Sequence, residues 1–150
     1  MERVKAGFAA EPASEERKQH DQLRLATAAV LLDIAYADDA FHPNETEDAL
    51  QYLQRAFQLS EGDARELIEA ADEIRNHTID HFAVTHYIRR NTTLEQRIDL
   101  VKTLWRLAYS DGKLAEYEGY LVRKLADLLG LEHHVMIDAK VAVLREREGT

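Results

Sequence analysis

Apolar residues recur along this chain at helical spacing, and apolar and polar residues nowhere alternate for the length of a β-strand. In two stretches, residues 26–37 and 100–108, apolar side chains occupy almost every side of the predicted helix. Such helices are typically buried on most sides, whereas a helix with a single apolar stripe lies at the surface. The pattern therefore predicts an all-α fold, a single-domain bundle of about seven helices.

Start and stop signals divide the chain into these helices. Gly130 is typical of a helix end, because glycine adopts the left-handed turn at low cost. A capping box is expected where a Thr is followed three residues later by Glu or Gln, either Thr92 with Glu95 or Thr93 with Gln96. The predicted helices span approximately 14–37, 43–58, 60–74, 76–91, 92–108, 116–129 and 132–147. Residues 1–13 are expected to be a flexible N-terminal tail, and the domain to cover 14–150.

Residues 76–91 fit a helix in more than one phase. The stretch from Asn76 to Thr78 offers side chains that cap a helix. Val84 and Ile88 are then expected to face the core, although Phe82 also calls for burial. The position of this helix is therefore the weakest part of the helical pattern.

An internal repeat organises the chain. Residues Leu31 to Asp38 read Leu-Leu-Asp-Ile-Ala-Tyr-Ala-Asp, and residues Leu104 to Asp111 read Leu-Trp-Arg-Leu-Ala-Tyr-Ser-Asp, 73 residues later. Each copy ends at an acidic turn, and a Glu follows seven positions after the Asp, as Glu45 and Glu118. A repeat of this kind predicts two helix pairs related by a pseudo-twofold axis, with the two most apolar helices at the centre.

Composition narrows the classes of function. The 150 residues contain no cysteine, which excludes disulfides and thiolate sites, and their net charge of −9 argues against a nucleic-acid partner. No apolar run reaches the length of a signal peptide or a membrane span, so we expect a cytoplasmic protein without membrane insertion. An unidentified protein partner and homo-oligomerisation both stay open.

The two acidic turns are the candidate metal site. The candidate ligands are Asp38, Asp39 and Glu45 at the first turn, and Asp111 and Glu118 at the second. Hard divalent cations prefer such oxygen ligands, and the ion could be Ca²⁺, Mg²⁺ or Zn²⁺. The alternative is purely structural: the two Glu residues cap the helices that they start, and the Asp residues bond the backbone of their own turns.

Histidines offer a second, weaker metal motif, and catalytic motifs are missing. His77 and His81 are four residues apart and would share one face of a helix, as zinc-ligand pairs do, with Glu73 and His86 nearby. No third ligand follows at helical spacing from both, so a surface pair is the preferred interpretation. The sequence has no phosphate loop, nucleophile elbow or His-Glu-x-x-His motif, so we expect no enzymatic activity.

The second acidic turn and its flanks resemble a known family. Residues Ala108 to Glu118 read Ala-Tyr-Ser-Asp-Gly-Lys-Leu-Ala-Glu-Tyr-Glu, and with the stretch Leu121 to Leu131 they are similar to the TerB family of tellurite-resistance proteins. The similarity runs from about residue 23 to residue 142. The first copy departs from the pattern, because Asp39 stands where the family usually has glycine.

The resemblance implies a helical bundle in the bacterial cytoplasm, tied to tellurite resistance and wider stress responses, with acidic positions suspected of binding divalent ions. The same module is similar to the amino-terminal domain of some membrane-anchored J-domain co-chaperones, where it serves as an interaction domain. We therefore expect a non-enzymatic TerB-like stress-response module that binds a divalent cation at its acidic helix junctions. The alternative is a protein-interaction scaffold whose acidic turns are structural.

Overall fold

The computed structural model describes residues 21–37, 43–75, 80–110 and 116–148. Within these residues the chain forms seven α-helices and no β-strand, which confirms the predicted all-α fold. The first helix covers residues 21–35, and the others are α2 (Pro43–Phe57), α3 (Glu61–Arg75), α4 (His81–Asn91), α5 (Leu94–Ala108), α6 (Glu116–Leu128) and α7 (His133–Glu148). No helix in these ranges is long and apolar enough to cross a membrane.

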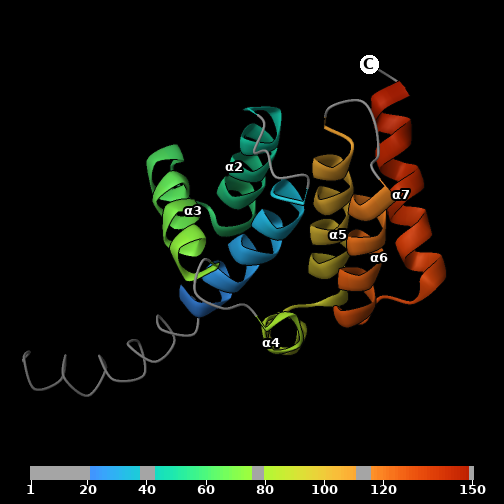
Figure 1. The fold of residues 1–150 in the computed structure, drawn as a ribbon, viewed down its shortest axis with the longest axis horizontal. Coiled ribbons are helices and arrows are strands. Elements are labelled where there is room, and N and C mark those ends of the chain that lie inside the picture. Colours follow the sequence, from blue (N-terminus) through green and yellow to red (C-terminus); the bar gives the residue numbers. More distant parts are fainter. Residues whose placement is uncertain (1–20, 38–42, 76–79, 111–115, 149–150) are drawn as a thin grey trace, which may run out of the picture.

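The helices form two groups (Figure 1). The first helix, α2 and α3 lie together in one group, and α5, α6 and α7 lie together in the other. Helix α5 packs against α6 and α7 of its own group and also against α2 of the first group. Helix α4 lies across one end of the molecule and contacts α6. The pseudo-twofold axis expected from the repeat stays a prediction.

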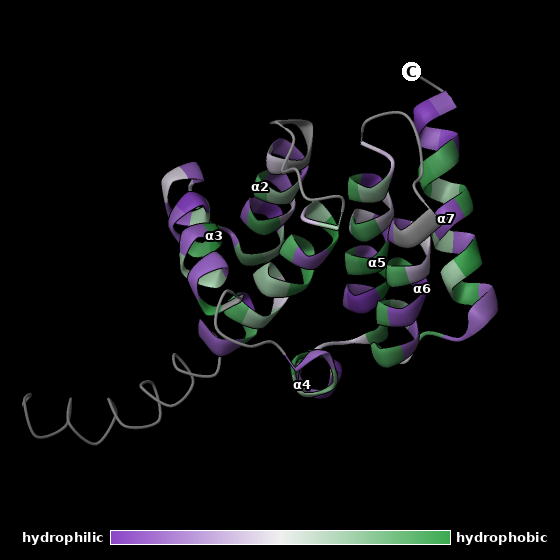
Figure 2. Ribbon diagram, viewed as in Figure 1, coloured by the Kyte–Doolittle hydropathy of each residue, from purple (hydrophilic) through white to green (hydrophobic). Residues whose placement is uncertain are grey.

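The core is built mainly from the two helices whose sequences are apolar on almost every side. Leu31 and Leu32 of the first helix are almost fully buried, as are Leu104 and Trp105 of α5. Figure 2 shows hydrophobic residues over much of both helices, whereas α3 is largely hydrophilic on its outer side. Full burial of a Leu-sized side chain contributes roughly 1.5–3 kcal/mol, so these two helices supply much of the folding free energy.

Local capping chemistry determines where several helices begin. Thr93 and Gln96 form the predicted capping box of α5, in which each side chain bonds the other's backbone N–H. The Ser60 hydroxyl accepts a hydrogen bond from the backbone of Asp63 and caps α3. These starts agree with the sequence analysis because each depends on residues only three positions apart.

Helix α4 corrects two expectations. Its N-cap is Asp80, whose carboxylate accepts hydrogen bonds from the next turn, so the cap expected between Asn76 and Thr78 is wrong. Ile88 is buried as expected, but Phe82 is 66% exposed rather than buried. Thr85 and Ile88 face the core, and position 82 lies about 90° around the helix from the midpoint between them, at the edge of the buried face.

Gly130 ends α6 in the manner expected of it. Its φ of +84° lies in the left-handed region, which glycine adopts without strain. The Arg89 side chain of α4 also lies against this glycine, where a Cβ atom would come within 2.7 Å of the Arg89 Nε atom. Gly130 therefore serves both the turn between α6 and α7 and the close approach of α4.

Candidate functional site

The structure locates the five predicted metal ligands only in part. Asp38, Asp39 and Asp111 lie outside the described residues. Glu45 belongs to the first turn of α2, but its side chain also lies outside the description. Glu118 is described, in α6. The meeting of the two acidic turns therefore stays a prediction.

Glu118 is buried. Only 3% of its surface is exposed, although it lies only two residues after the start of α6. Burying a carboxylate is costly unless charges or hydrogen-bond donors compensate it. Glu118 takes part in at least one polar or electrostatic contact within the chain. A Glu that only caps a solvent-exposed helix start would not require this burial. Capping alone therefore does not account for the position of Glu118.

The described residues do not contain a complete metal site. No group of three or more His, Asp or Glu residues among them could hold a metal ion. The two described histidines of the predicted zinc motif have other contacts, and His77 lies outside the description. His81 pairs with Asp33, with 2.7 Å between Nε2 and Oδ2, and His86 stacks on Phe82.

Asp33 is a polar residue that the search for motifs missed. It lies in the first helix among apolar side chains, and it is only 6% exposed. Its pairing with His81 joins the first helix to the start of α4. A carboxylate inside an apolar helical run was the signal in the sequence, but nothing there identified a partner 48 positions away.

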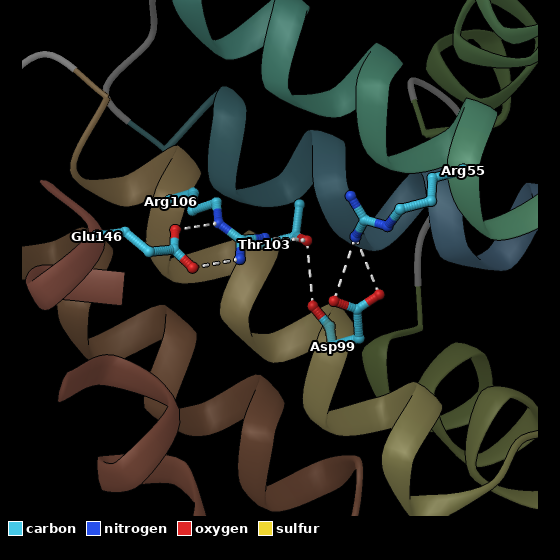
Figure 3. A network of polar contacts seen from close by, with 5 residues as sticks. All are labelled: Arg55, Asp99, Thr103, Arg106 and Glu146. Atoms are coloured by element: carbon cyan, nitrogen blue, oxygen red, sulfur yellow. Dashed lines mark hydrogen bonds and ion pairs between the residues drawn. The ribbon is translucent and has the colours of Figure 1, made fainter. Parts of the chain in front are cut away.

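A network of charged side chains crosses the surface of α2, α5 and α7 (Figure 3). Arg55 of α2 donates to both carboxylate oxygens of Asp99, at 3.0 and 3.2 Å. Arg106 donates to both oxygens of Glu146 in α7, at 2.9 and 3.0 Å, and also to the Thr103 hydroxyl. Thr103 in turn donates to the backbone carbonyl of Asp99, so α5 carries the middle of the network.

Two acidic side chains near Arg106 have pKa values that are shifted in opposite directions. The hydrogen bond from Arg106 lowers the pKa of Glu146 below its usual value of 4.5. Burial raises the pKa of Asp48 above its usual value of 3.8, although Arg106 and Arg147 oppose the shift. Burial also raises the pKa of the neighbouring Tyr52 hydroxyl. These shifts follow from the packing of the three helices.

Three hollows lie on the surface of the described residues, and the largest of the three lies over α4. It has a volume of about 500 Å³, and its lining comes from Gln22 of the first helix and from α4 between Phe82 and Asn91. A second hollow of about 380 Å³ lies between the first helix and α3, near Arg24 and Glu66. A third, of only about 110 Å³, lies where the first helix, α2, α4 and α5 meet.

Comparison with known proteins identifies the family. A family model described as "Tellurite resistance protein TerB" matches residues 24–141, which is most of the chain. Searches of curated proteins and of solved structures gave no significant match. The matched range contains the buried central helices, Glu118 and the second acidic turn. On this evidence the chain belongs to the TerB family.

Proposed function

We propose that this chain is a non-enzymatic stress-response module of the TerB type that binds a divalent cation at the junction between α5 and α6. The observation that carries the proposal is the burial of Glu118 in the first turn of α6, seven positions after Asp111 in the sequence. A carboxylate held away from water at such a junction offers a hard oxygen ligand whose solvation has already been lost.

The family resemblance supports the same interpretation. The second turn follows the family pattern through Asp111 and Gly112, whereas the first has Asp39 in place of the glycine. We therefore assign the ion to the second junction, with Asp111 and Glu118 as its protein ligands, rather than to both turns equally. Ca²⁺, Mg²⁺ and Mn²⁺ suit carboxylate oxygens better than they suit the imidazoles of this chain.

Calorimetric titration tests the proposal. We expect saturable heat with at least one of Ca²⁺, Mg²⁺, Mn²⁺ and Zn²⁺, and its loss in the double variant Asp111→Asn, Glu118→Gln. The matched control is Asp127→Asn, Glu132→Gln, which removes the same charge from exposed positions at the other end of α6 and should bind as wild type does. No saturable heat with any of the four ions would reject ion binding.

Thermal melting separates a ligand from a cap at Glu118. If Glu118 holds an ion, the ion raises stability by RT ln(1 + [L]/Kd), about 2.7 kcal/mol at one hundred times Kd, and Glu118→Gln removes most of this gain. If Glu118 only caps α6, the Gln variant keeps an acceptor oxygen and melts as wild type does. Superimposable curves across an ion series and in chelator would contradict the ligand role.

A protein-interaction scaffold is the second candidate function. The exposed Phe82 ring stacks on His86 beside the hollow over α4 and favours this function, because contiguous exposed apolar surface marks interaction sites. On this alternative, variants of the acidic turns would leave binding of the partner intact.

A further inference from the structure

Helix α4 differs in charge from the rest of the protein. It is the only helix among the described residues without an Asp or Glu, and it carries Arg89 and Arg90 in its last turn. No carboxylate within the described part of the chain forms an ion pair with either arginine. In a chain of net charge −9, this helix is therefore a locally positive surface.

The outer face of α4 also carries exposed aromatic side chains. Successive residues turn by 100° around a helix, so with Thr85 and Ile88 in the core, His86 and Arg90 face outward. The Phe82 and His86 rings are stacked, with 5.7 Å between their centroids and 9° between their planes. A flat aromatic stack beside a guanidinium offers both apolar contact and positive charge to one ligand.

This face borders the hollow of about 500 Å³ described above. Gln22 lies on its other side and accepts a hydrogen bond from the Tyr87 hydroxyl at 3.1 Å. No other described helix lies beyond α4 at this end of the molecule (Figure 1). The hollow is large enough for one large side chain of a ligand, and the rest of the ligand would lie along α4.

Helix α4 is held firmly in place from behind. Asp80 caps its first turn, and His81 pairs with the buried Asp33. The Thr92 hydroxyl donates to the carbonyl of Ile88 and closes its last turn. Because these contacts fix the helix before any ligand arrives, binding would cost little conformational entropy in the protein.

We propose that the outer face of α4, from Phe82 to Arg90, is a docking surface for an acidic peptide segment that carries an aromatic side chain. The aromatic side chain packs against the Phe82–His86 stack in the hollow, and the acidic residues pair with Arg90 and Arg89. Charge complementarity favours this partner, because the net charge of −9 repels an acidic chain while the basic surface of α4 attracts it locally. The proposal goes beyond ion binding and does not depend on it.

A synthetic peptide tests the proposal. The probe is a short fluorescein-labelled peptide of Glu and Ser with one central Trp, titrated with the full chain in chelator and followed by fluorescence anisotropy. We expect saturable binding that weakens as salt rises, because exposed charges are screened. Amide chemical shifts should change along α4 and around Gln22, and little elsewhere. The same peptide with Ala in place of Trp should bind more weakly.

Two pairs of variants locate the contact. Arg90→Glu and Phe82→Ala should each weaken binding by about tenfold or more, as removal of a central charged or aromatic contact does. The matched controls are Arg123→Glu and Tyr120→Ala on α6, which make the same changes at exposed positions and should bind as wild type does. All four positions are exposed, so the variants should keep the wild-type circular dichroism spectrum.

Several results would overturn the proposal. The first is no saturable binding of the acidic peptide, and the second is equal weakening by Arg90→Glu and Arg123→Glu, which would indicate unspecific attraction. The third is binding that persists in Phe82→Ala at full strength. Binding of a single-stranded oligonucleotide in preference to the peptide would assign the surface to nucleic acid instead. None of these outcomes depends on whether the second junction binds a cation, since every titration contains chelator.

Discussion

Within the repeat, the first helix and α5 share their apolar positions, and they differ in charge at one position. Leu31 and Ile34 of the first helix correspond to Leu104 and Leu107 of α5 in the repeat, and all four are almost fully buried. At the matched position between them, the first helix has Asp33 and α5 has Arg106.

The two polar residues attach different helices. Asp33 is buried and pairs with His81 of α4, whereas Arg106 is partly exposed and bonds Glu146 of α7 through two hydrogen bonds. The apolar positions of the repeat therefore build the core. The charged position of each copy pairs with a side chain of a further helix, α4 in the first copy and α7 in the second. Because Asp33 is buried and Arg106 is partly exposed, we expect the two pairs to stabilise the fold by different amounts.

The largest expected effects come from the shared apolar positions. Leu104→Ala and the matched Leu31→Ala should each lower the free energy of unfolding by about 2–5 kcal/mol, as removal of a buried Leu side chain does. Urea denaturation measures both. A loss below ~1 kcal/mol for either variant would mean that its helix is not central, and the comparison would fail for that copy.

Loss of the buried pair between Asp33 and His81 should have the next largest effect on the free energy of unfolding. His81→Ala removes one partner of a carboxylate that remains buried, and we expect a loss of about 1–3 kcal/mol in urea denaturation at neutral pH. His86→Ala on the exposed side of the same helix is the control and should stay within about 0.5 kcal/mol of wild type. Equal losses of unfolding free energy in the two variants would show that the contact with Asp33 does not contribute specifically to stability.

The exposed pair between Arg106 and Glu146 should contribute less to stability, and its contribution should depend on pH. The Arg106 hydrogen bond lowers the pKa of Glu146, so its stabilisation is present above the unfolded value near 4.5 and is lost as pH falls through the lower folded pKa. Glu146→Gln should therefore lose less than about 1 kcal/mol at neutral pH and match wild type in strong acid. Thermal melting over a pH series measures this, and a loss that persists in acid would contradict the ion pair as its cause.

The smallest expected effect has the opposite sign. Burial raises the pKa of Asp48 in α2, so its ionised form opposes folding as pH rises through the folded pKa. Asp48→Asn should therefore melt slightly above wild type at neutral pH, and the difference should shrink as pH falls. A variant that melts below wild type at neutral pH would show that attraction to Arg106 and Arg147 outweighs the burial of Asp48.

The sequence predicted the parts of this fold that depend on short spacing. The capping box at Thr93 and the buried apolar positions of α5 follow from residues three or four positions apart. The start of α4 could not be predicted in the same way, because several polar residues before it can all cap a helix, and tertiary packing of Ile88 selects the phase.

The candidate site was less predictable than the fold. Sequence spacing proposed Glu118 as a ligand or a cap, but its burial depends on packing that no local pattern encodes. The Phe82–His86 stack was equally hidden, because an aromatic residue in a helical pattern is normally expected to face the core. Its exposure became visible only once the phase of α4 was known.

The glycine beneath Arg89 has a consequence for cooperativity. Helix α4 touches the first group of helices through His81 and Asp33, and it touches the second through Arg89 and Gly130. The two groups therefore cannot separate without releasing α4 from one of them. A side chain at position 130 would displace Arg89 and loosen that link, so this one small residue helps the two groups unfold as a single unit rather than as two.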